Sequence, residues 1–352
     1  MSSSRIEIKF VCGANKKKLF SGSAIYRSSN ASADVLHWYN KVVIIESSRT
    51  TTQQQPLKQH NSTFYKQIIK AICLYYVLER NPRPIREIAI TQYVGSAREK
   101  RHSLGQKDLK QIVSKGTDLA ALQAIVHTKA ALLLEETVRG RAVLYAITHL
   151  IRSLDSNSPF DRFERLWRAF NALYRAFAKK GSDHECHVAL RDHIQQFPQF
   201  FPLSLKQVSP LTTGNIRLHL RWIQMIQNNH GTVKKAAMLR DSILRVEDHR
   251  ILEIYRDSLT VRTAHLNSIG AMPAIQSHIA VHTHLRSIRD SDVLSTLCVK
   301  YMYFVRNKIA HAERPDHSFS FLPGSAEEVE IQWLIPTLEA LVIDLVNISD
   351  TF

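Results

Sequence analysis

The segment Ser158–Phe177, SPFDRFERLWRAFNALYRAF, carries an aromatic residue at nearly every helical turn. Its aromatic residues are spaced three, four, three, four and three apart: Phe160, Phe163, Trp167, Phe170, Tyr174 and Phe177. Residues three and four apart share one side of an α-helix, so the pattern predicts a helix with a buried aromatic face. Ser158 and Pro159 favour the start of that helix.

The sequence around this helix is also helical in pattern from Gly116 onward. Apolar residues recur at helical spacing in further stretches: Leu119–Leu134, Arg141–Leu154, Asn215–Gln227, Val233–Leu259, Ser291–His311 and Ala326–Ile348. We therefore expect residues 131–352 to form a helical bundle.

The front of the chain has a different pattern. Arg5–Cys12 alternates polar and apolar residues as a half-buried strand does, and Val42–Ile45 and Ile85–Tyr93 are rich in strand-forming residues. Thr63–Arg80 has helical spacing and is followed by Pro82, which cannot continue a helix. We expect residues 1–130 to form a small α+β domain of two or three strands, and the fold class to be mainly α.

Charge is distributed unevenly between these parts. The 352 residues include 47 Lys and Arg against 31 Asp and Glu, a formal net charge of +16. Residues 1–150 hold 23 basic and 10 acidic side chains, a net charge of +13, whereas residues 151–352 hold 24 and 21, a net charge of +3. A positive excess of this size indicates a polyanionic partner, most often nucleic acid.

Two basic clusters in the front part are candidate RNA-binding residues. They are Lys16, Lys17 and Lys18, and Arg98, Lys100 and Arg101. Each cluster taken alone is equally well explained as a solvated face, and the charge by itself also fits a DNA-binding regulator.

Several other classes of protein are disfavoured by the composition. No apolar run approaches the roughly 20 residues of a membrane span, and the first residues lack the apolar stretch of a secretory signal. No CxxC pair and no glycine-rich phosphate loop occurs. His278, His282 and His284 lack an acidic or cysteine partner at the usual ligand spacing. Asp183–His187 places four possible ligands within five residues, too close together to converge on one metal, and we expect a surface loop there. We expect a cytoplasmic protein with no membrane contact, no cofactor and no metal.

The segment Tyr301–Arg314, YMYFVRNKIAHAER, contains residues suited to cutting RNA without a metal ion. Arg306 is permanently charged and binds a phosphate through two hydrogen bonds, and His311 titrates near neutral pH and transfers protons. With the ribose 2′-hydroxyl as the internal nucleophile, these groups supply charge stabilisation and acid–base catalysis. A buried pair of these types also occurs as a purely structural feature, for example one that bridges to Glu313.

Helical geometry limits how these residues can act together. At about 100° per residue, Asn307 and His311 lie roughly 40° apart, whereas Arg306 and His311 lie roughly 140° apart. Arg306 and His311 meet at one phosphate if the helix bends, if the arginine reaches round, or if two copies pair. A homodimer also supplies the two proton-transfer groups that acid and base roles require.

The segment resembles the Arg-x(4–6)-His signature of HEPN domains (higher eukaryotes and prokaryotes nucleotide-binding), through Arg306, Asn307 and His311. The helix Phe163–Tyr174, FERLWRAFNALY, is similar to the first bundle helix of bacterial HEPN proteins, and the resemblance spans residues 130–350. It implies a dimeric, metal-independent endoribonuclease of a toxin or anti-phage defence system, with a possible antitoxin or regulatory partner. Arg306 and His311 would be catalytic, and Asn307 would position one of them or the phosphate. The alternative is a catalytically silent HEPN module that binds RNA or regulates.

Overall fold

The computed structural model describes residues 2–11, 18–27, 32–39, 41–51, 54–79, 81–310 and 324–352. The chain divides into two compact units. Unit 1 comprises Met1–Ser156, Asn171–Phe177 and Val346–Phe352, and unit 2 comprises Asn157–Phe170 and Ala178–Leu345. The first division, after Ser156, lies beyond the predicted boundary at 130/131, because helix α3 (Val138–Leu154) packs with helix α1 (Thr63–Leu78) inside unit 1.

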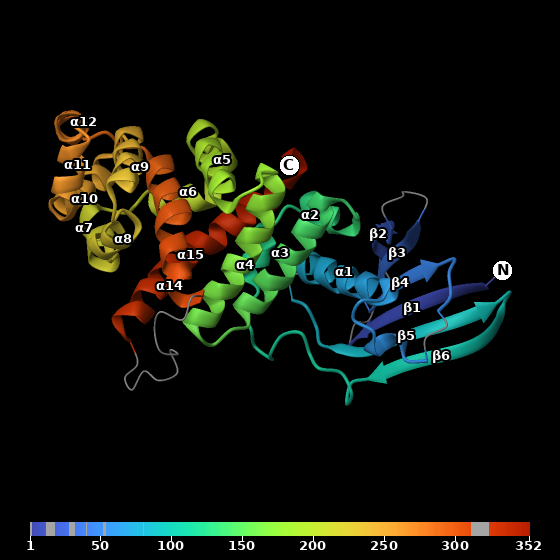
Figure 1. Cartoon of the computed structure of the whole chain (residues 1–352). Helices are drawn as coiled ribbons and strands as arrows, with labels where there is room; N and C mark the ends of the chain where they lie inside the picture. Colours follow the sequence, from blue (N-terminus) through green and yellow to red (C-terminus); the bar gives the residue numbers. More distant parts are fainter. Residues whose placement is uncertain are drawn as a thin grey trace. The chain divides into compact units, whose positions relative to one another are not determined.

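Unit 1 is built on a six-stranded antiparallel sheet with the strand order β2-β3-β4-β1-β5-β6 (Figure 1). The strands are β1 (Ser2–Phe10), β2 (Lys18–Ile25), β3 (Ala33–Tyr39), β4 (Val42–Ser47), β5 (Ile85–Val94) and β6 (Ala97–Gly105). The register aligns Ile6 of the central strand β1 with Ile45 on one side and with Ile90 on the other. The buried side chains of three strands therefore form one continuous apolar row.

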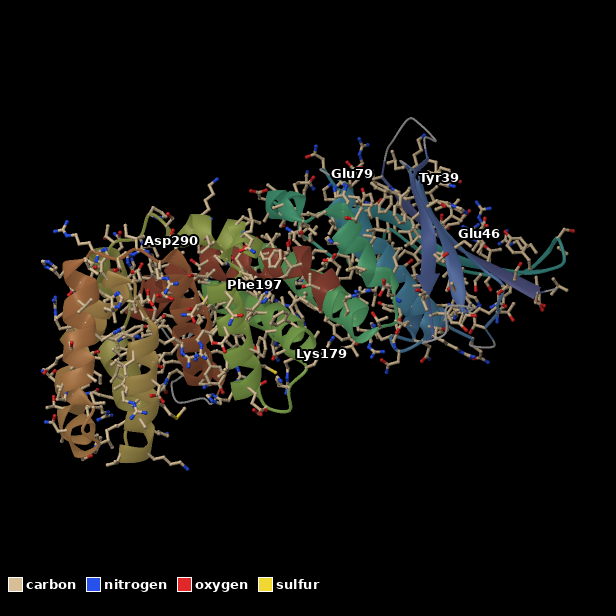
Figure 2. The ribbon with its side chains drawn as sticks, turned by 90° about the horizontal axis from the view of Figure 1, so that it is seen from above. Tyr39, Glu46, Glu79, Lys179, Phe197 and Asp290 are labelled. Carbon is tan, nitrogen blue, oxygen red and sulfur yellow. The ribbon has the colours of Figure 1, made fainter. Side chains whose placement is uncertain are left out.

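Helix α1 covers the apolar face of this sheet. The ring of Phe10 stacks on Tyr75 of α1 with 3.8 Å between centroids, and Trp38 meets the same ring edge-on at 5.8 Å. Tyr39 and Glu46, labelled in Figure 2, follow the buried residues Trp38 and Ile45 and so lie on the opposite face.

A buried lysine connects α1 to two nearby segments of unit 1. Lys70 is 1% exposed, and its Nζ donates to the carbonyl oxygens of Ile25 at 2.7 Å and Leu134 at 3.2 Å. The same amine forms an ion pair with Glu136 at 2.8 Å. Because its donors are satisfied, this charge is tolerated inside the unit and links α1, β2 and the segment before α3.

The expected fold class, mainly α with a front domain of two or three strands, is wrong. The sheet has six strands, so the fold is α+β with a large helical part. The strands missed most clearly are β2 and β6 at the two edges of the sheet, whose residues are largely exposed. Edge strands bury few side chains, and so they lack the apolar alternation from which a strand is predicted.

Unit 2 is helical, and so are the segments of unit 1 that follow the sheet. The helices after α3 are α4 (Pro159–Ala178), α5 (Asp183–Gln196), α6 (Pro202–Val208), α7 (Thr213–His219), α8 (Trp222–Asn229), α9 (Val233–Arg245), α10 (His249–Ser258), α11 (Thr263–Ser268), α12 (Met272–His284), α13 (Asp290–Ser295), α14 (Met302–Ala310) and α15 (Ala326–Asn347). Within α4, Phe163, Trp167, Phe170 and Tyr174 are at most 4% exposed, which confirms the predicted aromatic face. No helix in the described part of the chain is long and apolar enough to cross a membrane.

Gly140, in the first turn of α3, allows a close approach of the backbone. A Cβ at this position would lie 2.7 Å from the carbonyl oxygens of both Leu132 and Glu135. In an open helix, Gly→Ala stabilises by about 0.5–1 kcal/mol, but here the backbone must shift, so we expect Gly140→Ala to lower the unfolding free energy by about 1–3 kcal/mol. Urea unfolding measures this change. Gly105→Ala, where no atom lies within 4 Å of the new Cβ, is the control and should change it little. A stabilised Gly140→Ala variant would contradict the packing described.

Candidate functional site

Arg306 and Asn307 lie on α14, near the end of a helix with a π-helical segment in it. Residues Asp290–Ser295 form α13, Thr296–Tyr301 form the π-helical segment, and α14 follows without a break. Tyr301, Phe304 and Val305 are at most 1% exposed and fix the rotation of the helix. Arg306 and Asn307 are half-buried at the margin of this face. Short π-helical segments are frequent at functional sites.

Asn307 holds the guanidinium of Arg306. Arg306 Nη1 donates a hydrogen bond to Asn307 Oδ1 at 3.0 Å. Among the described residues, no carboxylate lies within ion-pair distance of Arg306. Other arginines of unit 2, such as Arg221 and Arg250, each form an ion pair with a carboxylate. The site therefore presents a fixed positive charge that the described residues leave uncompensated. Such a group is suited to bind a phosphate.

A buried network attaches the helix of Arg306 to α15. The hydroxyl of Tyr301 donates to Glu330 of α15 and accepts from the backbone N–H of Arg221 at 2.7 Å. The Arg221 guanidinium in turn forms ion pairs with Glu330 and with Glu327, the latter at 3.2 Å. Burial, and then the neighbouring Glu330 charge, raise the pKa of Tyr301, so the hydroxyl stays protonated and donates. This network fixes the helix one turn before Arg306.

An aromatic cluster packs against Tyr303, which lies three residues before Arg306. The ring of Tyr303 lies 4.9 Å from the ring of His187 on α5 and 6.2 Å from that of Trp167 on α4. Asp183–His187 is thus not a surface loop, as the sequence had suggested, but the start of α5. Ser182 and Glu185 form a capping box there, and that S-x-x-E spacing is a signal from which the helix start can be predicted.

Stability is expected to fall in acid because two histidines are buried in the neutral form. Burial lowers the pKa of His187 and of His230 from 6.5 to about 4. Between these values the unfolded chain binds protons that the folded chain does not, so the unfolding free energy falls as pH is lowered through this window. We expect each histidine to cost about 2 kcal/mol between pH 7 and pH 5.

Urea unfolding at the two pH values measures this loss. The loss of unfolding free energy between pH 7 and pH 5 should be smaller for His187→Phe than for the wild type. For His284→Phe it should equal the wild-type loss, since His284 is exposed. An equal loss in the wild type and in His187→Phe would contradict the burial of a neutral imidazole.

The structure describes only some of the residues predicted for the site. His311, Lys16 and Lys17 lie outside the described residues. Arg306 and Asn307 are brought together, as described above. The catalytic roles of Arg306, Asn307 and His311 stay predictions.

The described residues of the two basic clusters are not brought together. Lys18 lies on β2 and Arg98, Lys100 and Arg101 lie on β6, at opposite edges of the sheet. Five strand spacings of about 4.8 Å separate these edges, a distance of about 24 Å. Arg101 also forms an ion pair with Glu87, whereas Arg98 and Lys100 are exposed. A nucleic acid that contacts both clusters would have to span the sheet.

Lys300, in the π-helical segment, was not singled out from the sequence. Its Nζ donates to the hydroxyl of Tyr255 at 2.9 Å, and burial lowers the pKa of Lys300 to about 7. Lys300 precedes Arg306 by six residues, or about 9 Å along the helix axis. A lysine in a helix is normally solvated, so no pattern in the sequence distinguishes this one.

We compared the chain with models of protein families, with curated proteins and with solved structures, and none of the three comparisons found a match.

Proposed function

We propose that the chain is a metal-independent endoribonuclease whose active site contains Arg306, Asn307 and His311. The observation that carries this proposal is the half-buried Arg306 guanidinium, held by Asn307 and without a carboxylate partner among the described residues. His311 follows in the chain, four residues after Asn307. This arrangement and the resemblance to HEPN domains support the same chemistry.

The reaction needs no external cofactor. The ribose 2′-oxygen attacks the adjacent phosphorus, and the bond from phosphorus to the 5′-oxygen breaks. The 2′-hydroxyl loses its proton to a base and the leaving 5′-oxygen gains one from an acid, the roles of His311 and of its copy in a dimer. Arg306 stabilises the negative charge that develops on the phosphate oxygens. The products are a 2′,3′-cyclic phosphate and a 5′-hydroxyl.

The basic unit 1 would attract RNA through its positive charge, and this attraction would weaken as salt is added. By the resemblance to HEPN proteins, the enzyme would work in the cytoplasm as a homodimer in a toxin or anti-phage defence system. An antitoxin or another regulatory partner would then control it.

Incubation with total RNA in excess EDTA tests the proposal. The wild type and His284→Ala, a matched change at an exposed histidine, should cut RNA, and His311→Ala should not. Intact RNA with the wild type, or equal cutting by His311→Ala, would overturn it. RNA that is bound on a filter but left intact by the wild type would instead indicate the catalytically silent RNA-binding module.

A further inference from the structure

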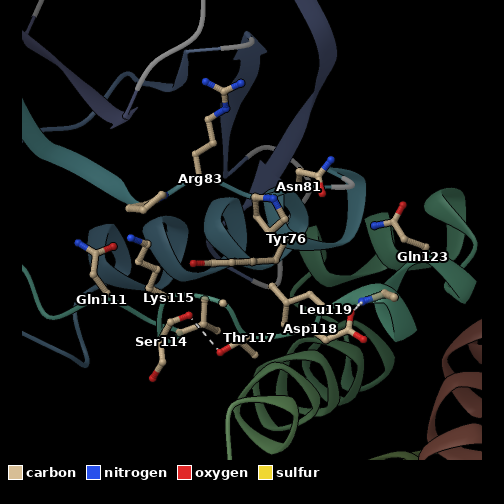
Figure 3. A pocket seen from close by; sticks show the side chains of 15 residues that line it. Tyr76, Asn81, Arg83, Gln111, Ser114, Lys115, Thr117, Asp118, Leu119 and Gln123 are labelled. Atoms are coloured by element: carbon tan, nitrogen blue, oxygen red, sulfur yellow. Dashed lines mark hydrogen bonds between the residues drawn. The ribbon is translucent and has the colours of Figure 1, made fainter.

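Unit 1 contains a pocket that lies outside the RNA-cleavage motif. It has a volume of about 870 Å³ and is formed by three parts of the unit: the end of α1, the connection to β5, and residues 111–123 (Figure 3). This volume falls in the range of about 300–1,000 Å³ that is usual for sites that bind small molecules.

The wall formed by residues 112–117 is anchored to the end of α3. Asp155 Oδ1 accepts hydrogen bonds from the N–H of Ser114 and from the hydroxyl of Thr117, both at 2.7 Å. Arg152 forms an ion pair with Asp155 at 2.6 Å and donates to the carbonyl of Ile112. Gly116 has a φ of +89°, a conformation that glycine adopts without strain. The wall is therefore pre-formed.

Three polar side chains that line the pocket already form hydrogen bonds within unit 1. The amide of Gln111 exchanges two hydrogen bonds of 3.0 Å with the backbone of Ile85. Asp118 Oδ1 accepts from the N–H of Ala120 at 2.9 Å, and Gln123 Nε2 donates to the carbonyl of Val77. These groups build the pocket and are not available as its main ligand contacts.

Tyr76 supplies a hydroxyl group that no described residue hydrogen-bonds. The residue is 2% exposed, and its hydroxyl makes no hydrogen bond to any described residue. Figure 3 shows the hydroxyl pointing toward the wall of Gln111, Ser114 and Lys115. Burial, and then the neighbouring Tyr75, Cys73 and Asp155, raise the pKa of Tyr76, so its hydroxyl stays protonated and is a donor at neutral pH. The hydroxyl oxygen is reached by solvent from the pocket, so a ligand there can accept a hydrogen bond from it.

The charge of the pocket favours an anion. Its lining includes two cations, Arg83 and Lys115, and one carboxylate, Asp118, so positive charges outnumber negative ones. Among the described residues, Lys115 has no ion-pair partner. Apolar side chains are present as well, namely Pro82, Pro84 and Leu119. The pocket thus combines a cationic part with an apolar surface on which a flat ring can lie.

We infer that this pocket binds a nucleoside monophosphate, with the phosphate at Lys115 and the Tyr76 hydroxyl and the base against the proline and leucine side chains. The ligand is either a free nucleotide or the 5′-phosphorylated end of an RNA, which has the same chemistry. The site lies in unit 1 and does not depend on the proposed cleavage by unit 2.

Calorimetric titration of the full-length chain tests this site. The probes are the four nucleoside 5′-monophosphates, inorganic phosphate, and a 2′-O-methyl tetranucleotide with and without a 5′-phosphate, which cannot be cleaved by 2′-hydroxyl attack. We expect at least one monophosphate or the 5′-phosphorylated tetranucleotide to bind. The preferred probe should bind at least tenfold more tightly than inorganic phosphate, and which of the two binds more tightly identifies the source of the ligand.

Three variants locate the binding. Tyr76→Phe, which removes only the hydroxyl, and Lys115→Ala should each weaken binding at least tenfold without lowering the unfolding temperature. Lys110→Ala, an equal loss of charge at an exposed lysine outside the pocket lining, should bind like the wild type. Absence of binding by every probe, equal binding of inorganic phosphate, or wild-type affinity in both Tyr76→Phe and Lys115→Ala would overturn the inference.

Discussion

Replacement of Arg306 by alanine is expected to lower the rate of RNA cleavage by about 100- to 1,000-fold, the usual effect of removing one group that stabilises transition-state charge. The guanidinium is held by Asn307, so it is oriented before RNA binds and loses little freedom in the transition state. Arg306→Lys keeps the charge but loses the planar pair of donors, and should recover only part of the activity. The rate at saturating RNA measures this effect.

The control for this change is an arginine with its own acidic partner. Arg240 is paired with Asp241 on α9, and Arg240→Ala should cut RNA at the wild-type rate. Wild-type cleavage by Arg306→Ala, with RNA bound normally, would remove Arg306 from the mechanism. Comparable losses in Arg306→Ala and Arg240→Ala would show an effect of total charge and not of the site.

Arg250→Met is expected to lower the unfolding free energy by about 3–5 kcal/mol, the usual cost of removing one partner of a buried ion pair. Arg250 Nε and Nη2 donate to the two oxygens of Asp248 at 3.0 and 2.8 Å, and Nη2 also reaches Asp290 at 2.7 Å. The third nitrogen, Nη1, donates to the carbonyl of Leu211 at 3.0 Å. Asp248 is 0% exposed, so without Arg250 its charge is buried and uncompensated.

Urea unfolding of three variants separates this effect from a general loss of packing. The double variant Asp248→Asn with Arg250→Met removes the uncompensated charge and should regain part of the lost stability. Arg240→Met, at a more exposed ion pair, should cost less than about 1 kcal/mol. A cost for Arg250→Met as small as that of Arg240→Met would contradict a buried network.

The long helices could be predicted from the sequence because their burial is periodic. The aromatic spacing after Ser158 predicted α4, which begins at Pro159, and the predicted helix Ala326–Ile348 corresponds to α15, Ala326–Asn347. Helix α4 buries one face along most of its length, and the first half of α15 does the same, so tertiary packing and local pattern agree there. Residues 337–346 of α15 are buried on nearly all sides.

The sheet could be predicted only in part. The central strands β1 and β5 bury alternate or successive apolar residues, and both were expected. Strand β6 has the sequence AREKRHSLG, and its charges were interpreted as a binding cluster. Their pairing with β5, including the ion pair between Arg101 and Glu87, depends on residues far away in sequence. Local patterns do not contain that information.

One candidate site is formed by residues adjacent in sequence, and the other by residues far apart in sequence. Arg306 and Asn307 are adjacent in sequence, so their contact could be anticipated. The pocket in unit 1 combines Tyr76, Arg83 and Lys115, which belong to three separate segments, and no sequence motif marks it. Only the folded structure shows that no described residue forms a hydrogen bond with the Tyr76 hydroxyl.

The central claim is that the ribose 2′-hydroxyl is the nucleophile, and a pair of matched substrates tests it most directly. An RNA oligonucleotide and its fully 2′-O-methylated copy are incubated with the wild type in EDTA, and the termini of any products are identified by mass spectrometry. We predict that only the unmodified RNA is cut, and that its products end in a 2′,3′-cyclic phosphate and begin with a 5′-hydroxyl. Cleavage of the methylated copy, or products with a 5′-phosphate, would contradict the mechanism.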